Sequence, residues 1–307
     1  MTAPLTNGHG DARSGPFADI AEVVRRLDAV DYLADDGLAA AVYFATALHR
    51  PLLLEGEPGV GKTTAAKAIS AAMGAPLIRL QCYEGLTVSE SLYEWNYQRQ
   101  LLSIRLAEAR GDDLRQADLF TEDYLAERPI LRAVRHHGPT PAVLLIDEID
   151  RADDEFEALL LEFLGEASVT VPELGTFTAD TPPVTILTSN RSRELHDALR
   201  RRCLYHWIEF PGPERAAAIV RRTVPWATEP LVASTTEFIG RVRTLDLDKA
   251  PGLAEAIDWV SALAAIGATD LVREDIITSL GSIAKTPGDR GAVLAAVDTF
   301  GVPAHGH

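Results

Sequence analysis

Residues 56–63 read Gly56-Glu57-Pro58-Gly59-Val60-Gly61-Lys62-Thr63, with Thr64 next, and this stretch decides the fold. The apolar run Leu52-Leu53-Leu54 precedes it, and a helical pattern over residues 62–73 follows it. Strand, glycine-rich loop and helix in this order are what a phosphate-binding loop requires. Glycine allows the positive φ angles with which successive backbone N–H groups surround a phosphate. We therefore predict that residues 57–64 bind the phosphates of ATP, with Lys62 on the terminal phosphates.

A pair of carboxylates follows a second apolar strand. Residues 142–146 are apolar and lead directly into Asp147 and Glu148. In open α/β sheets, ligands bind at the carboxyl ends of the strands, so both side chains are expected at the nucleotide. We predict that Asp147 and the Thr63 hydroxyl hold Mg²⁺, and that Glu148 activates the attacking water.

Two further polar positions are candidates for the same site. Asn190 follows the apolar strand over residues 184–188, where an amide is suited to orienting the attacking water or contacting the γ-phosphate, although a turn-forming asparagine is the alternative. Arg201 and Arg202 belong to a run of three arginines. An arginine here is suited to stabilising charge on the transferring phosphoryl group, within the chain or across a subunit interface. A solvated basic run is the alternative.

The order of the elements predicts an α/β fold with a parallel sheet covered on both faces, because buried strands alternate with helices. Residues 91–110 and 121–136 show helical patterns, and residues 168–178 resemble a hairpin. Beyond residue 211 the patterns are helical only. We expect a disordered tail over residues 1–16, an αβα nucleotide-binding domain over 17–211, and a smaller all-helical lid domain over 212–307.

The composition and net charge limit the kinds of partner and the location that we expect for this protein. The chain has 307 residues and a formal net charge of −16, which disfavours a nucleic-acid partner because binding to phosphate backbones needs a cationic surface. Cys82 and Cys203 are the two cysteines, and their wide spacing predicts reduced thiols. The N-terminus lacks the pattern of a signal peptide, and no apolar run is long enough to span a bilayer. We expect a cytoplasmic protein without a transmembrane segment.

These motifs resemble those of AAA+ ATPases, in order and spacing, over about residues 17–283. Residues 56–63 resemble Walker A, residues 144–148 Walker B, Asn190 sensor 1, and Arg201 with Arg202 the arginine-finger region. Within AAA+ the chain resembles the MoxR group of the helix-2-insert branch, through the extended segment 81–97 and the hairpin before Asn190. Residues 81–102 and 249–259 resemble the MoxR subgroup associated with maturation of carbon-monoxide dehydrogenase.

The resemblance implies more than the residues show. It implies a hexameric ring, an adaptor with a von Willebrand factor A domain, and a molybdenum-containing dehydrogenase as the client whose active site the ATPase matures. It also implies that Arg202 is favoured over Arg201 as the finger. Many MoxR proteins carry a sensor 2 arginine where this chain reads Ala250-Pro251-Gly252-Leu253-Ala254. Sensing of the γ-phosphate by the lid domain is then either absent or done by another residue, such as Lys249 or Arg243.

Other functions compete with an ATPase that remodels a protein. A P-loop small-molecule kinase would phosphorylate a metabolite without releasing phosphate, and the Asp147-Glu148 pair with the helical C-terminal domain favours the ATPase over it. A nucleotide-gated scaffold would bind ATP but hydrolyse it only when a partner is present, which the missing sensor 2 arginine favours. A nucleic-acid motor is disfavoured by the net charge.

The insert also carries an aromatic group. Tyr93, Trp95 and Tyr97 are spaced two residues apart. This spacing is consistent with an exposed surface that faces a client, and equally with a half-buried segment.

Overall fold

The structure, a computed structural model, describes residues 15–111, 113 and 115–303. Residues 1–14 of the expected N-terminal tail lie outside the described residues. The chain divides into two compact units. The first contains the residues up to 30, residues 34–55 and residues 63–207, and the second contains residues 31–33, residues 56–62 and the residues from 208 on. The phosphate loop therefore groups with the C-terminal helices by its contacts.

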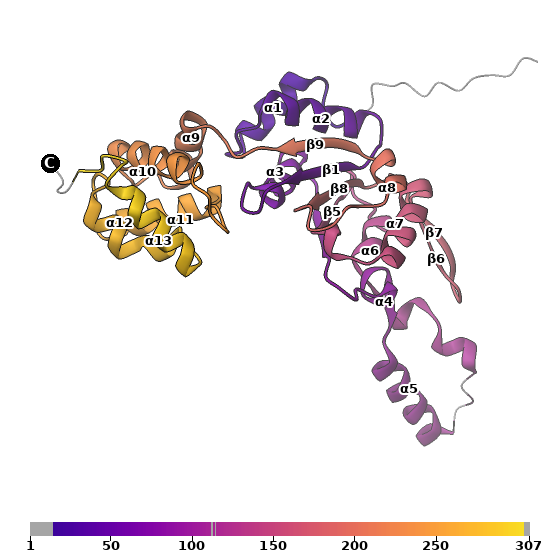
Figure 1. Ribbon diagram of the computed structural model, residues 1–307. Helices are drawn as coiled ribbons and strands as arrows, with labels where there is room; N and C mark the ends of the chain where they lie inside the picture. Colours follow the sequence, from indigo (N-terminus) through magenta and orange to yellow (C-terminus); the bar gives the residue numbers. More distant parts are fainter. Residues whose placement is uncertain (1–14, 112, 114, 304–307) are drawn as a thin grey trace, which may run out of the picture. The chain divides into compact units, whose positions relative to one another are not determined.

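A five-stranded sheet forms the centre of the first unit, in the order β2-β5-β8-β1-β9 (Figure 1). The strands are β1 (Leu52–Gly56), β2 (Leu77–Gln81), β5 (Val143–Asp147), β8 (Val184–Ser189) and β9 (Leu204–Ile208). The β2–β5, β5–β8 and β1–β8 pairs are parallel. The predicted α/β fold is confirmed. The edge strand β9 was not predicted, because four of its five residues remain partly or fully exposed and show no apolar run.

Helices cover both faces of this sheet (Figure 1). They are α1 (Ile20–Asp28), α2 (Asp36–Ala47), α3 (Lys62–Met73), α6 (Pro129–Val134), α7 (Asp154–Glu166) and α8 (Asp197–Arg202). One core cluster joins Leu144, Ile146 and Leu187 of the strands to Ile130 of α6 and Phe156 of α7. Successive strand residues point to opposite faces, so the intervening apolar residues of each strand serve the other face. This double burial explains the continuous apolar runs in the sequence.

The segment after β2 contains a helix in each of the two predicted spans, together with elements that were not predicted. It contains α4 (Val88–Ser91), β3 (Tyr93–Trp95), α5 (Tyr97–Arg110), the 3₁₀ turns Gln116–Leu119 and Glu122–Tyr124, and β4 (Leu125–Glu127). β3 and β4 pair antiparallel, and the Trp95 ring packs against Phe120 at 5.1 Å. The helical prediction was wrong for these two strands, because three residues are too few to show a period and pairing across the insert decides their conformation.

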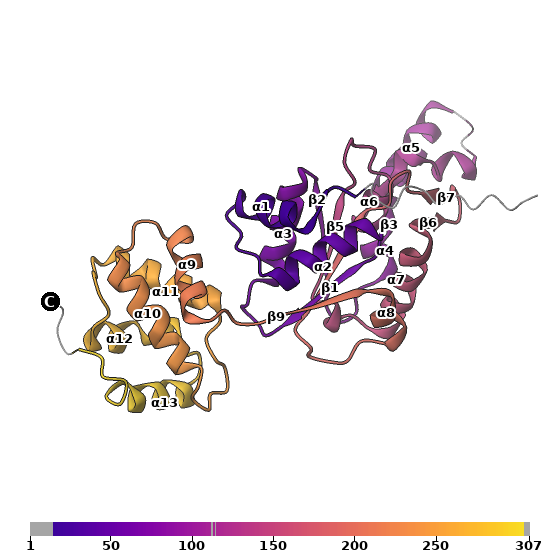
Figure 2. The ribbon, with the colours of Figure 1, turned by 90° about the horizontal axis from the view of Figure 1, so that it is seen from above.

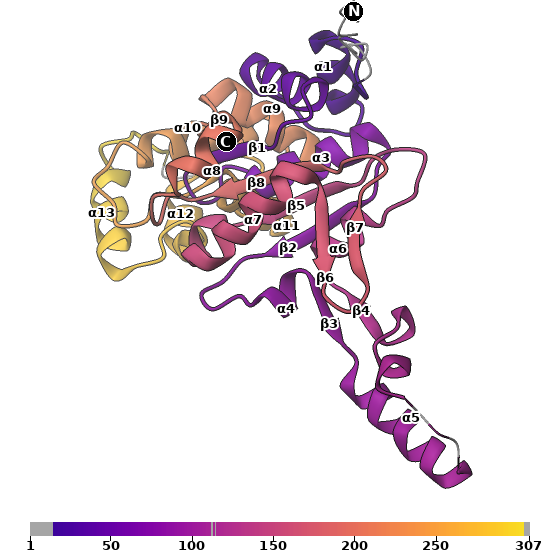
Figure 3. The same ribbon diagram turned by 90° about the vertical axis from the view of Figure 1, so that its right-hand side faces the viewer.

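α5 extends away from the sheet and leaves large apolar side chains in solvent (Figure 3). Trp95 is buried and Tyr93 is half-buried, so of the three predicted aromatic residues Tyr97 alone is exposed. We call the exposed side chains of Tyr97, Leu101, Leu102 and Leu106 the α5 apolar face. The predicted hairpin is confirmed: β6 (Ser168–Val171) pairs antiparallel with β7 (Gly175–Thr178).

The second unit is helical beyond residue 208 (Figure 2). Its helices are α9 (Pro213–Thr223), α10 (Glu229–Val242), α11 (Leu253–Ala265), α12 (Arg273–Ser279) and α13 (Pro287–Val297), with a 3₁₀ turn at Leu280–Ser282. The fully buried Trp259 of α11 anchors its core, packing on Phe238 of α10 at 5.6 Å and donating its indole N–H to Ser279. In the described part of the chain, no helix is both long and apolar enough to cross a membrane.

Candidate functional site

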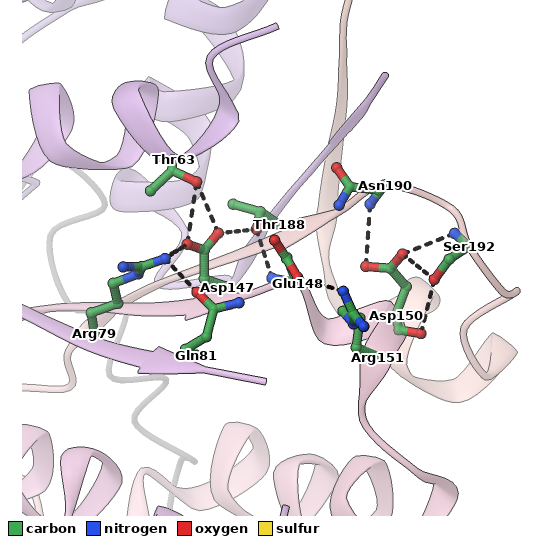
Figure 4. Close-up of polar contacts among 10 residues, drawn as sticks. All are labelled: Thr63, Arg79, Gln81, Asp147, Glu148, Asp150, Arg151, Thr188, Asn190 and Ser192. Carbon is green, nitrogen blue, oxygen red and sulfur yellow. Dashed lines mark hydrogen bonds and ion pairs between the residues drawn. The ribbon is translucent and has the colours of Figure 1, made fainter. Parts of the chain in front are cut away.

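The carboxyl end of β5 meets the start of α3 through Thr63 and Asp147 (Figure 4). The Thr63 hydroxyl donates to the two carboxylate oxygens of Asp147 at 3.0 and 3.2 Å. Asp147 is 2% exposed and takes part in the β2–β5 register opposite Gln81. Hydroxyl and carboxylate oxygens are hard ligands of the kind Mg²⁺ prefers. The residues present therefore fit the metal that the sequence predicted between these two side chains.

Two further side chains reach Asp147 that the sequence analysis did not select. Arg79 of β2 donates from Nε at 3.0 Å and from its terminal amino group at 2.5 Å to Oδ2. Thr188 of β8 donates its hydroxyl to Oδ1 at 2.5 Å. Arg79 is the one charged residue of β2, where it interrupts the apolar residues Leu77, Ile78 and Leu80, and this signal was available in the sequence. Thr188 gave no signal, since threonine is ordinary in a buried strand.

Glu148 stands at the turn that follows β5. Its backbone has a φ of 57°, in the left-handed region, which is uncommon outside glycine and clusters at functional sites. Its backbone N–H donates to the Thr188 hydroxyl at 2.9 Å, and its carboxylate lies 3.6 Å from the Arg151 guanidinium. The side chain is about one-third exposed. A held backbone with an accessible carboxylate suits a base that acts on water.

Asn190 lies one residue beyond β8, next to the turn at Glu148 (Figure 4). Its backbone N–H donates to Asp150 at 3.2 Å, and Ser192 donates to the same carboxylate from its backbone at 2.8 Å and its hydroxyl at 2.6 Å. Asp150 is buried. The Asp150 carboxylate therefore joins the ends of β5 and β8 and places Asn190 beside an open cleft.

The phosphate loop has the geometry that its glycines predict. Gly59 and Gly61 have φ angles of 79° and 96°. An added Cβ at Gly56 would stand 2.5 Å from the Ile208 carbonyl oxygen, so the start of the loop also needs glycine. The Lys62 ammonium donates to the carbonyl oxygens of Gly56 and Glu57, each at 2.8 Å. The expected phosphate-binding lysine is thus held over its own loop.

Comparison with known families agrees with this arrangement. Residues 51–203, from β1 through α8, match the family described as the AAA domain of the dynein-related subfamily. The chain carries an AAA domain. A search of curated proteins found no match.

Solved structures similar to the chain include Thermotoga maritima RuvB, described as a Holliday junction branch migration motor, with 18% identity and a TM-score of 0.43. The match covers 80% of this chain and 66% of RuvB. A proline-to-glycine variant of the same RuvB gives 18% identity and a TM-score of 0.47, covering 86% of this chain and 70% of the other.

The arginine run of the AAA domain lies apart from the hydrogen-bonded cluster at Asp147. Arg201 and Arg202 are exposed at the end of α8, and the Arg201 guanidinium lies 3.6 Å from Asp197. The Arg50 guanidinium donates to the carbonyl oxygens of Arg202 at 3.0 Å and of Arg201 at 2.7 Å. Arg50 therefore fixes the end of α8, and both arginine side chains point into solvent from a held backbone.

The cysteines of the AAA domain are buried and take no part in a disulfide. Burial raises the pKa of Cys82 to about 12, and the nearby carboxylate of Asp147 adds to the shift. Burial likewise raises the pKa of Cys203 to about 12. Both thiols stay protonated at neutral pH and are unsuited to nucleophilic chemistry, because the thiolate is the reactive form.

Proposed function

We propose that this chain is a Mg²⁺-dependent ATP phosphohydrolase. The observation that carries the proposal is the contact between the Thr63 hydroxyl and the buried Asp147 carboxylate, directly after a glycine-rich loop and inside an AAA domain. Thr63 and Asp147 are 84 positions apart in the sequence, and the fold brings the two motifs that contain them into contact. A chance match of either motif to the family pattern would not produce this contact.

Each residue has a role in this proposal. Backbone N–H groups of residues 57–64 and the Lys62 ammonium hold the phosphates. Thr63 and Asp147 hold Mg²⁺, which supplies a charge that neutralises the developing negative charge of the phosphoryl group. Glu148 takes a proton from the attacking water, and Asn190 orients that water. The exposed Arg202 stabilises the transferring phosphoryl group from a neighbouring subunit.

Glu148→Gln tests the proposal. The change keeps the shape of the side chain and removes its basicity, so we expect phosphate release to fall at least about 100-fold while ATP still binds. Phosphate release and binding of a fluorescent ATP analogue measure the two effects. Glu155→Gln is the matched control, since Glu155 lies in the exposed first turn of α7. Turnover retained by Glu148→Gln would remove Glu148 from the role of base.

We further propose that the ATPase is a MoxR-type chaperone in a hexameric ring, which works with a von Willebrand factor A-domain adaptor to mature a molybdenum-containing dehydrogenase. The resemblance of the insert segment 81–102 and of residues 249–259 supports this. The α5 apolar face supports a protein partner as well, because four large apolar side chains remain exposed on one helix. Arg105 and Arg110 of α5 favour a partner surface bordered by carboxylates.

Client activation tests this finer proposal. The apo-dehydrogenase is incubated with its cofactor, the adaptor, ATP and this protein, and we expect its activity to appear only with the complete mixture. Leu102→Asp places a charge in the α5 apolar face and should abolish activation while basal phosphate release stays unchanged. Leu48→Asp, at an exposed position at the end of α2, is the control. Activation that survives Leu102→Asp would exclude this face as the partner surface.

A nucleotide-gated scaffold is the second candidate, and a specific observation favours it. Asp147 is engaged by Arg79, Thr63 and Thr188, and Lys62 is engaged by loop carbonyls. Nucleotide and metal must displace these contacts, which favours slow turnover by the protein alone. If this candidate holds, phosphate release stays near background until the partner is added, although ATP binds with Mg²⁺.

A further inference from the structure

Arg243 joins the helical part of the second unit to the phosphate loop. It follows α10 directly, and its side chain is 14% exposed. The guanidinium forms an ion pair with the Glu57 carboxylate, donates to the Pro251 carbonyl oxygen at 2.7 Å, and lies over the Phe210 ring at 4.0 Å. Three different partners therefore hold this cation beside the second residue of the loop.

The start of α11 contacts the same loop through its backbone. The N–H groups of Leu253 and Ala254 point to the Gly59 carbonyl oxygen at 3.0 and 3.3 Å. An added Cβ at Gly252 would stand 2.9 Å from the Gly59 Cα. Here two glycines touch at the place where a sensor 2 arginine was expected and is missing. The loop and the helix can approach this closely because neither residue carries a side chain.

The charges around Glu57 connect its ion pair with Arg243 to the binding of phosphate at this loop. Glu57 lies in a loop whose N–H groups are expected to bind phosphate, and a bare carboxylate there repels a polyphosphate. Arg243 neutralises the Glu57 side chain, and Lys62 is held by the Glu57 carbonyl oxygen at 2.8 Å. Two cations therefore meet at one loop residue, and a terminal phosphate offers both of them stronger acceptor oxygens.

We propose that Arg243 reads the terminal phosphate of ATP in place of the missing sensor 2 arginine, exchanging the Glu57 carboxylate for a phosphate oxygen. This inference rests on the proposed ATPase function. Because ADP lacks the terminal phosphate, Arg243 keeps its pairing with Glu57 when ADP is bound. Arg243 therefore contributes to the affinity for ATP and much less to the affinity for ADP. A purely structural ion pair would contribute equally to both.

The affinity ratio between ATP and ADP is the measurement that separates these roles. All variants are made in the Glu148→Gln background to prevent hydrolysis, and fluorescent ATP and ADP analogues are titrated with Mg²⁺. Arg243→Ala removes one charge-assisted contact, so we expect ATP affinity to fall roughly 10- to 100-fold and ADP affinity to change less than about threefold. Arg243→Lys should recover part of the ATP affinity. Glu57→Gln frees Arg243 and should raise the ratio.

Arg241→Ala is a matched control. Arg241 ends the same helix, donates to a backbone carbonyl oxygen and lies over an aromatic ring, with Phe300 as both partners. It contacts no loop residue in these interactions, so its removal should leave the ratio unchanged. The control therefore removes a hydrogen bond to a backbone carbonyl oxygen and a contact with an aromatic ring, as Arg243→Ala does, but it removes no contact with the phosphate loop.

Equal losses of ATP and ADP affinity in Arg243→Ala, or the same change in Arg241→Ala, would overturn the proposal. If circular dichroism shows that Arg243→Ala does not fold, Glu57→Gln serves as the test. An unchanged ratio of ATP affinity to ADP affinity in that variant would contradict the proposal that Arg243 exchanges Glu57 for a phosphate oxygen. If the proposed ATPase function is wrong, the result is distinguishable from these outcomes, because the parent protein would then bind neither ATP nor ADP.

Discussion

At the residue scale, Thr188 links the two carboxylates of the candidate site. Its hydroxyl donates to Asp147 and accepts from the Glu148 backbone N–H, and its side chain is buried. A single oxygen therefore holds both the carboxylate that we propose to bind metal and the backbone turn that carries the proposed base. Thr188 is a positioning residue, since it acts through its two neighbours.

Thr188→Val tests this link. Valine has nearly the same shape, but it removes one hydrogen bond to a carboxylate and leaves the Glu148 N–H without its acceptor. Such a loss costs about 1.5–3 kcal/mol, so we expect phosphate release to fall roughly 10- to 100-fold and the Mg²⁺ requirement to rise. A Mg²⁺ titration of phosphate release measures both.

Thr185→Val serves as the control for that substitution. Thr185 lies in the same strand, is also buried, and bonds only distantly, at 3.5 Å, to the Pro183 carbonyl oxygen. Thr185→Val should leave turnover within about twofold, because the hydroxyl makes only this weak hydrogen bond and does not contact the candidate site. If the two variants lose activity equally, Thr188 has no special role at the site.

At the scale of elements, the phosphate loop and α11 touch through Gly59 and Gly252. This contact involves only backbone, so its strength depends on the missing side chains at both positions. The pairing also explains why the loop groups with the C-terminal helices and not with the sheet that precedes it.

Gly252→Ala should destabilise the protein. The added methyl group meets Gly59 and the Glu255 carboxylate at 2.9 and 2.8 Å, and overpacking of this kind costs about 1–3 kcal/mol. Gly291→Ala, in the interior of α13 with open space around its Cβ, should instead stabilise by roughly 0.5–1 kcal/mol. Thermal unfolding of both variants compares them. A Gly252→Ala protein as stable as the parent would show that this contact is not maintained in solution.

At the scale of the whole molecule, we propose that the exposed arginines of α8 complete the site of a second copy. Arg50 holds the backbone of Arg201 and Arg202, while their side chains remain in solvent. A held backbone with exposed guanidinium groups is what a finger that acts on a neighbouring subunit requires.

Mixed assemblies test a finger that acts between subunits. Arg202→Ala and Glu148→Gln should each be inactive alone. Mixed in equal amounts, about a quarter of the interfaces would pair an intact Glu148 with an intact Arg202, and turnover should partly return. Arg201→Ala mixed in the same way shows which arginine acts. Absence of recovery with either arginine variant would contradict a finger in trans.

The sequence by itself determined the phosphate loop, the strand that ends at Asp147, the strand that ends just before Asn190, the α/β fold and the helical C-terminal part. These features are local: each depends on a short run with a clear period or on glycines at fixed spacing. The short strands β3 and β4 and the edge strand β9 were not predictable in this way. Their conformation depends on pairing with distant segments, and their residues carry no period of their own.

Only the tertiary structure decided which residues Arg79, Thr188 and Arg243 contact. Arg79 lies 68 positions from Asp147 in sequence, and Arg243 lies 186 positions from Glu57. A lone arginine or threonine has many possible partners, and sequence spacing does not select among them. The fold selects one, because parallel strands bring their carboxyl ends to one edge and two glycines allow α11 to reach the loop. The sequence thus predicted which groups bind phosphate and metal, and the tertiary structure showed which side chains hold those groups in place.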